Sequence, residues 1–328
     1  MPRVFKRVLL AVLALAIAGA VAFRYSPWPG ALLIRHAFTR DGRRIGEALA
    51  RHVPPGITRL ENQVYAAGDP DARLDVFFPD SAGLLPTIVW VHGGAWLAGS
   101  KDELTNYFRI LAGRGFTVIG LEYGLAPRHR YPTPVRQVNE ALAYIRANAD
   151  RFHADTLRLF LGGDSGGAQI AAQVALVLTD SAFARAMGLR AGADGGLLRG
   201  LVLYCGPYDV GAVNLEGAFA GFLRTVLWSY SGRRDWPADT AFRRASVVNY
   251  VRGTFPPAFI TVGNADPLAP QSRALAAALV KAGVTIDTLF YPADHPASLQ
   301  HEYQFNLDLP EGRLALDRTV AFLHQRLR

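Results

Sequence analysis

The chain has 328 residues, half of them hydrophobic, which is enough for one large domain with a buried core of its own. Its net charge of +8 would suit a nucleic-acid partner only if the basic residues clustered or formed a binding motif, and they do neither. Cys205 is the only cysteine, which excludes a disulfide within the chain, and its apolar neighbours favour a small buried side chain over a reactive thiol.

Residues 1–30 are expected to be a signal peptide or a signal anchor with a linker. An apolar run over residues 8–23 follows three basic residues and is shorter than the roughly 20 residues of a comfortable membrane span. Small residues at 20–22 favour cleavage, whereas Tyr25 and Trp28 look like an interfacial aromatic belt and favour an anchor. Both alternatives predict export, either with membrane association through residues 8–23 or with release into the periplasm or the medium.

The remaining residues, 31–328, are expected to form one catalytic domain. Residues 25–30 are predicted to be a linker, followed by an amphipathic helix over 31–52 that is broken near Asp41-Gly42. Alternating apolar runs then predict strands at Asn62 to Tyr65, Leu74 to Phe78, Leu85 to Val91, Phe116 to Tyr123, Leu157 to Leu161, Leu197 to Tyr204, Ala258 to Gly263 and Thr285 to Tyr291.

Helical patterns separate these strands, at Leu104 to Leu111, Val135 to Ala147, Ile170 to Leu178, Arg273 to Lys281 and Arg313 to Leu327. Alternating strands and helices predict an α/β fold in which a mainly parallel sheet is covered by helices on both faces. Residues 210–257 interrupt the alternation and are rich in aromatic residues. They are expected to be either a helical cap inserted over a pocket or a long helical crossover.

The feature around which the chain is organised is the sequence Gly163-Asp164-Ser165-Gly166-Gly167, between a predicted strand and a predicted helix. A strand that reverses into a helix within a few residues strains the central residue and brings the residues two positions away close to the turn. Glycine at both of those positions removes the side chains that would clash. Ser165 would then lie at a helix N-terminus, where unpaired N–H groups favour negative charge, and we expect it to be a nucleophile.

A serine nucleophile needs a base to accept its proton and an acid to orient that base. Asp266 follows the strand Ala258 to Gly263 directly, at the sheet edge where the active sites of parallel sheets lie, and it is the predicted acid. His295 and His301 both follow the last strand and are the candidate bases. We prefer His301, because the proline after His295 restricts the backbone there.

The oxyanion that forms during attack needs N–H donors. Gly93 and Gly94 are the predicted donors from one loop and Gly166 from the nucleophile turn, since none of them has a side chain in the way. His92 is expected to brace the loop by hydrogen bonding, and Trp96 to line the pocket or support the loop.

These motifs together resemble the hormone-sensitive-lipase-like branch of the α/β-hydrolase superfamily, over about Leu74 to Leu327. The resemblance rests on His92-Gly93-Gly94-Ala95, the serine motif, Asp266-Pro267-Leu268, and Tyr123-Gly124-Leu125-Ala126-Pro127 followed by Tyr131-Pro132. The chain departs from the family at Gly124, which replaces arginine, Ala95, which replaces glycine, and Gly166, which replaces alanine. It also lacks a simple His-Gly-Phe at the predicted base.

The resemblance implies an α/β-hydrolase fold and a serine carboxylesterase or lipase-like enzyme. Such an enzyme cleaves small or medium apolar esters through an acyl-enzyme, with no metal and no organic cofactor. The segment His92 to Trp96 is also similar to the His-Gly-Gly-x-Trp signature of arylformamidases, which leaves amide hydrolysis as an alternative. A third alternative is a non-catalytic small-molecule receptor, because gibberellin receptors resemble this family. Neither the oligomeric state nor the natural substrate follows from any motif.

Overall fold

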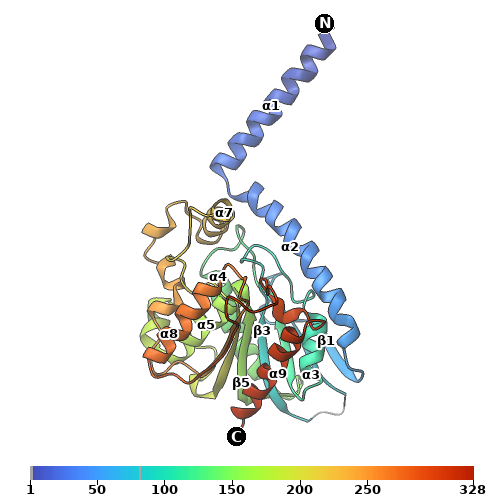
Figure 1. The fold of residues 1–328 in the computed structure, drawn as a ribbon, viewed down its shortest axis with the longest axis vertical. Coiled ribbons are helices and arrows are strands. Elements are labelled where there is room, and N and C mark those ends of the chain that lie inside the picture. The colour runs from blue at the N-terminus through green and yellow to red at the C-terminus, as the bar shows by residue number, and fades with distance from the viewer. Residues whose placement is uncertain (1–2, 81–82) are drawn as a thin grey trace.

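A single eight-stranded sheet forms the centre of the protein in this computed structural model, which describes residues 3–80 and 83–328 (Figure 1). The strand order is β1-β2-β4-β3-β5-β6-β7-β8. Strand β2 pairs antiparallel with β1 and β4, and all other neighbours pair parallel. The strands are β1 (Ile57–Val64), β2 (Arg73–Pro79), β3 (Leu85–Val91), β4 (Thr117–Leu121), β5 (Ala154–Asp164), β6 (Leu198–Tyr204), β7 (Ala258–Val262) and β8 (Ile286–Phe290).

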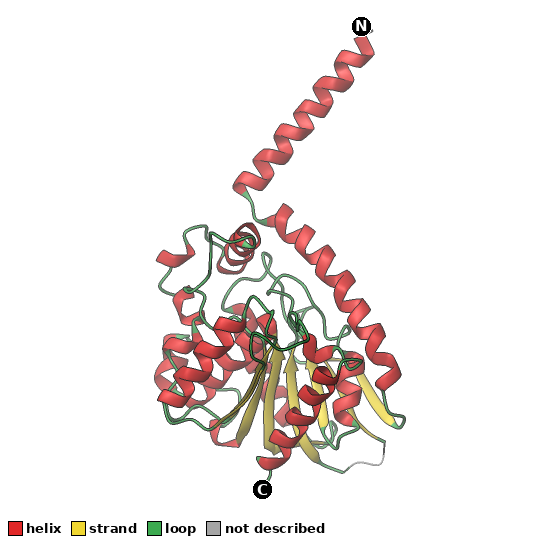
Figure 2. Ribbon diagram, in the orientation of Figure 1, coloured by secondary structure: helices red, strands yellow, loops and turns green. Residues whose placement is uncertain are grey.

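Helices cover both faces of this sheet (Figure 2). One hydrophobic cluster packs α4, α5 and α8 on one face, and a second cluster packs α3 and α9 on the other. Val89 and Val91 belong to the first cluster and Ile88 and Trp90 to the second, as the alternation of side chains along β3 requires. The α-helices are α1 (Arg3–Tyr25), α2 (Trp28–Leu49), α3 (Thr105–Ala112), α4 (Thr133–Ala147), α5 (Ser165–Thr179), α6 (Ser181–Ala186), α7 (Ala220–Ser231), α8 (Ala269–Lys281) and α9 (Pro310–Gln325).

The predicted α/β architecture is confirmed, with strands at every predicted position. The largest difference in the sheet is β1, which begins at Ile57 instead of Asn62. Its register shifts between Leu60 and Gln63, where Asn62 has a φ of 52° and donates its N–H to Asp75. This β-bulge interrupts the alternation of side chains, which explains why the first half of the strand did not stand out in the sequence.

The prediction of a break near Asp41-Gly42 is wrong, because α2 continues through these residues. An ideal Cβ at Gly42 would lie 2.1 Å from the Glu103 carboxylate, and one at Gly46 would lie 2.6 Å from the Glu103 carbonyl oxygen. The two glycines therefore allow close packing of α2 against Glu103 instead of ending the helix.

The predicted linker over residues 25–30 is also wrong in extent. Helix α1 ends at Tyr25 and α2 begins at Trp28, which leaves only residues 26–27 between them. Pro29 lies in the first turn of α2, where a missing N–H costs nothing. Helix α1 is long and apolar enough to cross a membrane, and it also has the position of a signal sequence; residues 1 and 2 of the predicted segment lie outside the described residues.

Residues 210–257 leave the sheet and contain α7 together with three short 3₁₀-helices, Trp236–Ala238, Phe242–Ala245 and Val247–Asn249. Further 3₁₀-helices are Ala50–His52, Gly195–Leu197 and Tyr303–Phe305. Helix α7 packs beside α2 near the base of α1, and the rings of Phe38 and Phe222 lie 5.8 Å apart (Figure 1). Several aromatic residues of this segment pack into the core, since Tyr230 stacks on Trp96 and contacts Phe242.

Candidate active site

The turn at Ser165 joins β5 to α5 without an intervening residue. Ser165 has a φ of 47°, a strained value for a residue with a side chain. An ideal Cβ at Gly163 would lie 2.7 Å from the Gly167 backbone, and one at Gly167 would lie 2.1 Å from the Val91 carbonyl oxygen. Both glycines are therefore required by close backbone contacts, and the strained turn presents the Ser165 hydroxyl at the carboxyl edge of the sheet.

A continuous chain of hydrogen bonds links Ser165, His301 and Asp266. His301 Nε2 lies 3.0 Å from Ser165 Oγ, and His301 Nδ1 lies 2.8 Å from Asp266 Oδ2. Because a carboxylate can only accept, Nδ1 carries the proton in the neutral ring, and in that form Nε2 can accept a proton from the Ser165 hydroxyl. Asp266 follows β7 and His301 follows β8, so the ends of neighbouring strands bring together residues that are distant in sequence.

The other candidate base, His295, does not contribute to this chain. Its Nε2 lies 2.9 Å from the Glu311 carboxylate at the start of α9, and its ring packs on Tyr291. The hydrogen bond from His295 lowers the pKa of Glu311, as expected for an ion pair at the surface. Of the two candidates, the structure therefore brings His301 to Ser165 and uses His295 to fasten the preceding loop to α9.

The electrostatic surroundings of His301 favour its charged form. Desolvation by itself lowers the pKa of this imidazole, but the hydrogen bond to Asp266 and the charge of the Glu302 carboxylate raise it above its usual value. Glu302 Oε1 lies 3.7 Å from His301 Nε2. Glu302 also has a φ of 60°, so a strained residue directs a second carboxylate towards the imidazole. Nothing in the sequence around Glu302 indicated that its carboxylate would approach the His301 imidazole.

The loop after β3 contains three consecutive residues with positive φ, namely Gly94, Ala95 and Trp96. The structure corrects the prediction for Gly93, because its N–H donates to Asp164 Oδ2 at 2.7 Å and is already engaged. Gly94 and Gly166 remain the candidate donors for an oxyanion. An ideal Cβ at Gly166 would lie 3.2 Å from the Trp96 nitrogen, so this loop packs directly on the Ser165 turn.

His92 braces this loop from within the protein, as predicted. Its Nδ1 lies 2.8 Å from the Gly93 carbonyl oxygen and its Nε2 lies 3.1 Å from a Glu122 carboxylate oxygen. Both partners are acceptors, an arrangement that favours a proton on each ring nitrogen. Burial lowers the pKa of His92, but the hydrogen bond and charge of Glu122 outweigh it and raise the pKa overall.

Trp96 supports the loop and is not among the residues that line the cavity. It donates to the Gln169 side chain at 3.2 Å and stacks on Tyr230 at 4.5 Å.

Asp164, for which no role was predicted from the sequence, accepts hydrogen bonds from Trp90 at 2.8 Å and from Gly93. Burial and the charge of Glu302 raise the pKa of Asp164 to about 8. A carboxyl group at the fully buried end of β5, directly before Ser165, was the available signal.

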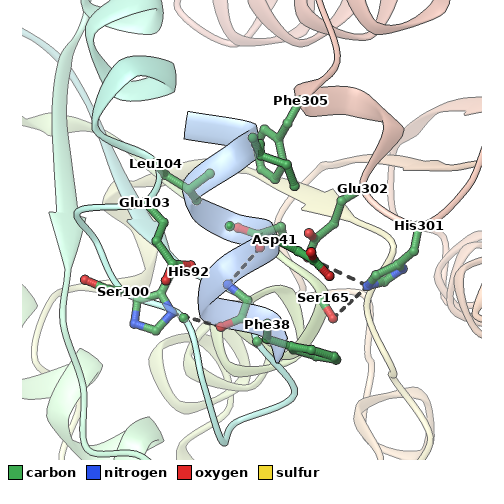
Figure 3. A pocket seen from close by; sticks show the side chains of 16 residues that line it. Phe38, Asp41, His92, Ser100, Glu103, Leu104, Ser165, His301, Glu302 and Phe305 are labelled. Carbon is green, nitrogen blue, oxygen red and sulfur yellow. Dashed lines mark hydrogen bonds and ion pairs between the residues drawn. The ribbon is translucent and has the colours of Figure 1, made fainter. Parts of the chain in front are cut away.

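A cavity of about 250 Å³ opens beside Ser165 (Figure 3). Helix α2 crosses it and contributes Phe38, Asp41, Gly42 and Ile45 to its wall. Among the described residues that line this cavity, none comes from 210–257, which was expected to be either a cap over the pocket or a helical crossover, and α2 supplies this part of the wall. The remaining lining residues are His92, Gly93, Gly94, Gly99, Ser100, Glu103, Leu104, Asp164, Ser165, His301, Glu302 and Phe305.

Helix α2 is fastened to the same loop that carries the candidate oxyanion donors. Arg35 Nε donates to the Leu97 carbonyl oxygen at 2.7 Å, and Arg35 Nη2 donates to the Ala126 carbonyl oxygen at 2.9 Å. Leu97 in turn donates its N–H to Gly94. One guanidinium thus joins the helix over the pocket to the loop beneath it, a role that an arginine in an amphipathic pattern does not reveal.

Within the described part of the chain, the group of side chains that could hold a metal ion is Cys205, Asp266 and His301, whose ligand atoms lie within 4.8 Å of one another. Cys205 is fully buried, as predicted. Burial raises the pKa of its thiol to about 11 despite the opposing effect of His301, so the thiol is neutral near pH 7 and a poor ligand. The cluster therefore fits a hydrogen-bonded imidazole with a thiol neighbour better than a metal centre.

Comparison with known proteins identifies this architecture. The family model described as alpha/beta hydrolase fold matches residues 88–296, which is more than half of the chain. The chain is 30% identical over 269 residues to esterase LipQ of Mycobacterium tuberculosis. The alignment covers 78% of this chain but only 62% of LipQ, so the chain spans less than two thirds of that relative.

Two solved structures extend the similarity to more than nine tenths of the chain. Esterase B from Lactobacillus rhamnosis superposes with a TM-score of 0.76 at 23% identity, covering 91% of this chain and 96% of that one. Ester-hydrolase EH1AB1, from the metagenome of Lake Arreo and solved with a derivative of bipyridine phosphonate, has a TM-score of 0.69 at 26% identity and covers 98% of both chains. All three relatives are named as esterases or ester hydrolases.

Proposed function

The chain belongs to the alpha/beta hydrolase fold family, in its hormone-sensitive-lipase-like branch, and from that premise we propose that it is a serine carboxylic ester hydrolase. The observation that carries the proposal is the chain of hydrogen bonds from Asp266 through His301 to Ser165, at 2.8 and 3.0 Å. The names of its relatives, which are esterases, support the same reaction class.

In the proposed reaction the Ser165 oxygen attacks the ester carbonyl while His301 Nε2 accepts the hydroxyl proton. Asp266 holds the Nδ1–H and stabilises the imidazolium that results. Collapse of the tetrahedral intermediate passes the proton from Nε2 to the leaving alcohol and leaves an acyl group on Ser165. Water, activated by the same nitrogen, then releases the acid and restores the serine.

The tetrahedral intermediate has a negatively charged oxygen. We assign the N–H groups of Gly94 and Gly166 as the donors that stabilise this oxygen. Gly166 is in the first turn of α5, where N–H groups have no partner within the helix and the helix dipole favours an anion. The hydrogen bond from Gly93 to Asp164 fixes the adjacent loop. Donors held in place before the reaction need no reorganisation as charge develops, and each is worth about 2.7 to 4 kcal/mol.

The size and lining of the cavity support short or medium acyl groups. About 250 Å³ is below the range of pockets that hold drug-sized ligands. Its apolar lining comes from Phe38, Ile45, Leu104 and Phe305. We therefore assign small apolar carboxylic esters as the substrate class.

The N-terminal segment supports a location outside the cytoplasm. Arg3, Lys6 and Arg7 precede the apolar part of α1, and basic residues flanking such a segment stay on the cytoplasmic side. The catalytic domain would then be exported, whether α1 is retained or cleaved. Protease added to intact spheroplasts should digest the catalytic domain, and complete protection would contradict export.

A substrate panel tests the proposed reaction. Aryl esters of increasing acyl length are assayed beside an N-formyl aromatic amine with the purified full chain. We expect hydrolysis of the short and medium esters, with turnover falling as the acyl chain exceeds the cavity. Preferential cleavage of the formyl amide would favour the arylformamidase alternative, and tight binding without any turnover would favour the receptor.

A further inference from the structure

The last residue of α1 and the first turns of α2 together expose an apolar surface. Tyr25, Trp28, Leu32 and Leu33 are between 41% and 75% exposed, although each is a large hydrophobic or aromatic residue. We call these four residues the α2 rim. Trp28 and Leu32 are four residues apart and therefore lie on one face of the helix.

The exposed surface of α2 becomes basic farther along the helix. His36, Arg40 and Arg44 follow the rim in the next turns, and all three are exposed. Arg43 is also exposed, whereas the nearby acids are Asp41, which lies 3.6 Å from Arg44, and Glu47. An exposed helix that is apolar near α1 and then basic along its length matches the order of layers from the acyl chains to the headgroups of a bilayer.

This surface is fastened to the catalytic domain. Ala31 is fully buried within the rim, and an ideal Cβ at Gly30 would lie 2.8 Å from Thr225 of α7. Arg234 donates to the Arg24 carbonyl oxygen at the junction of α1 and α2, and its guanidinium lies over the Trp228 ring. With the two hydrogen bonds of Arg35, these contacts set the orientation of α2 on the domain.

The pocket lies close to this surface. Phe38, which lines the cavity, follows Leu33 by five residues, or about 8 Å along the helix axis. Helix α1 projects from the same end of the domain, and its 23 residues give a length of about 34 Å, similar to the roughly 30 Å of a hydrocarbon core (Figure 2). Because α1 leads directly into the rim, a bilayer that α1 enters would also reach the rim. Lipid is therefore the partner that suits the exposed rim residues.

We propose that the α2 rim is seated in the interface of the lipid bilayer that α1 enters, so that the cavity beside Ser165 opens close to the membrane surface. The rim residues enter the boundary between acyl chains and headgroups, and the basic residues that follow them on α2 face anionic headgroups. This inference rests on the proposed function in one respect: the ester that reaches Ser165 is one that dissolves in the membrane.

A fluorescence experiment tests the seating without any catalysis. The full chain is reconstituted into vesicles of phosphatidylcholine with an equal share of phosphatidylglycerol, in which a fraction of the lipid carries bromine high on the acyl chain. We expect the bromolipid to quench Trp28, measured as the difference between the parent chain and Trp28→Phe. The double variant Leu32→Ser with Leu33→Ser should lose at least half of this quenching, whereas Val280→Ser with Leu314→Ser, which alters exposed residues of α8 and α9, should retain it.

A kinetic experiment tests whether the ester reaches Ser165 from the membrane. The same variants are assayed with an ester dissolved in the vesicles and with a water-soluble ester. The Leu32, Leu33 variant should lose about tenfold in kcat/KM for the membrane ester, because removing two exposed leucines from the rim weakens its contact with lipid. Its rate with the soluble ester should match that of the control.

The outcomes separate the two proposals. Unchanged quenching of Trp28 in the Leu32, Leu33 variant overturns the seating, whatever the enzyme hydrolyses. Equal losses on both esters also overturn it, because the leucines would then support folding instead of contact with lipid. Absence of all hydrolysis by the parent chain rejects the proposed function alone, since the quenching experiment remains decisive for the seating.

Discussion

The turn at Ser165 and the cover formed by α2 face each other across one cavity, yet they are specified in opposite ways. The turn depends on five consecutive residues, and at two of them, Gly163 and Gly167, backbone contacts are shorter than a Cβ would tolerate. The cover depends on α2, which lies more than 100 residues earlier and reaches the cavity through single side chains such as Phe38 and Asp41. Local strain defines the nucleophile, whereas tertiary packing defines what can reach it.

We therefore expect changes in the turn at Ser165 to abolish catalysis or folding. Changes in α2, which covers the cavity, should only alter the catalytic rate. Arg35 is the link between the two regions, because it joins α2 to the loop that packs on the turn.

The largest effect is expected for Ser165→Ala. Removing the nucleophile should lower the turnover of aryl esters by about 10⁴- to 10⁶-fold, the range seen when such residues are removed from serine hydrolases. The side chain makes one hydrogen bond, to His301, so the thermal unfolding midpoint should stay close to that of the parent chain. Undiminished turnover would eliminate Ser165 as the nucleophile.

Gly167→Ala should be the most damaging change to folding. Its Cβ would lie 2.1 Å from the Val91 carbonyl oxygen and 2.3 Å from the His92 carbonyl oxygen, and backbone cannot move aside cheaply. We expect a loss of about 3 kcal/mol in the free energy of unfolding, measured by urea denaturation. Gly221→Ala in α7 is the matched control, because nothing lies within 4 Å of its Cβ position and alanine favours a helix. Similar stabilities for the two variants would contradict the steric account of the turn.

Arg35→Met tests the link between the regions. The substitution keeps the apolar stem but removes both donors, leaving the Leu97 and Ala126 carbonyl groups without the guanidinium. A small shift of the loop should misplace the oxyanion donors and lower kcat by about tenfold, with a smaller effect on KM. Arg146→Met on α4 changes an exposed arginine away from the site and should leave kcat unchanged. A kcat for Arg35→Met equal to that of this control would show that the two regions act independently.

Glu302→Gln should have the smallest effect, and it should appear in the pH profile. The Glu302 carboxylate raises the pKa of His301 by stabilising the imidazolium, and catalysis requires the neutral form. Removing the charge should therefore lower that pKa and move the acid limb of kcat/KM to lower pH, with little change on the alkaline side. A shift of the acid limb of kcat/KM to higher pH would contradict the claim that Glu302 raises the pKa of His301.

The same contrast explains what the sequence could and could not predict. Parallel strands, the turn at Ser165 and the order of candidate catalytic residues follow from local patterns, such as glycine at positions 163 and 167. A helix over 31–52 could be predicted but its continuity could not, because Gly42 looks like a helix breaker until Glu103 is seen packed against it. Gly93 was misassigned for a related reason, since its partner Asp164 is 71 residues away. The roles of Arg35 and Glu302 likewise depend on long-range contacts that no local pattern encodes.

The most direct measurement of the central claim is covalent labelling by a fluorophosphonate, located by mass spectrometry of the peptides. The parent chain, His301→Ala and His295→Ala are treated in parallel, and the unfolding midpoint of each is recorded as a control. The account predicts that the label is on Ser165 in the parent chain and in His295→Ala, and that it is almost lost in His301→Ala. Full labelling of His301→Ala together with loss in His295→Ala would contradict it.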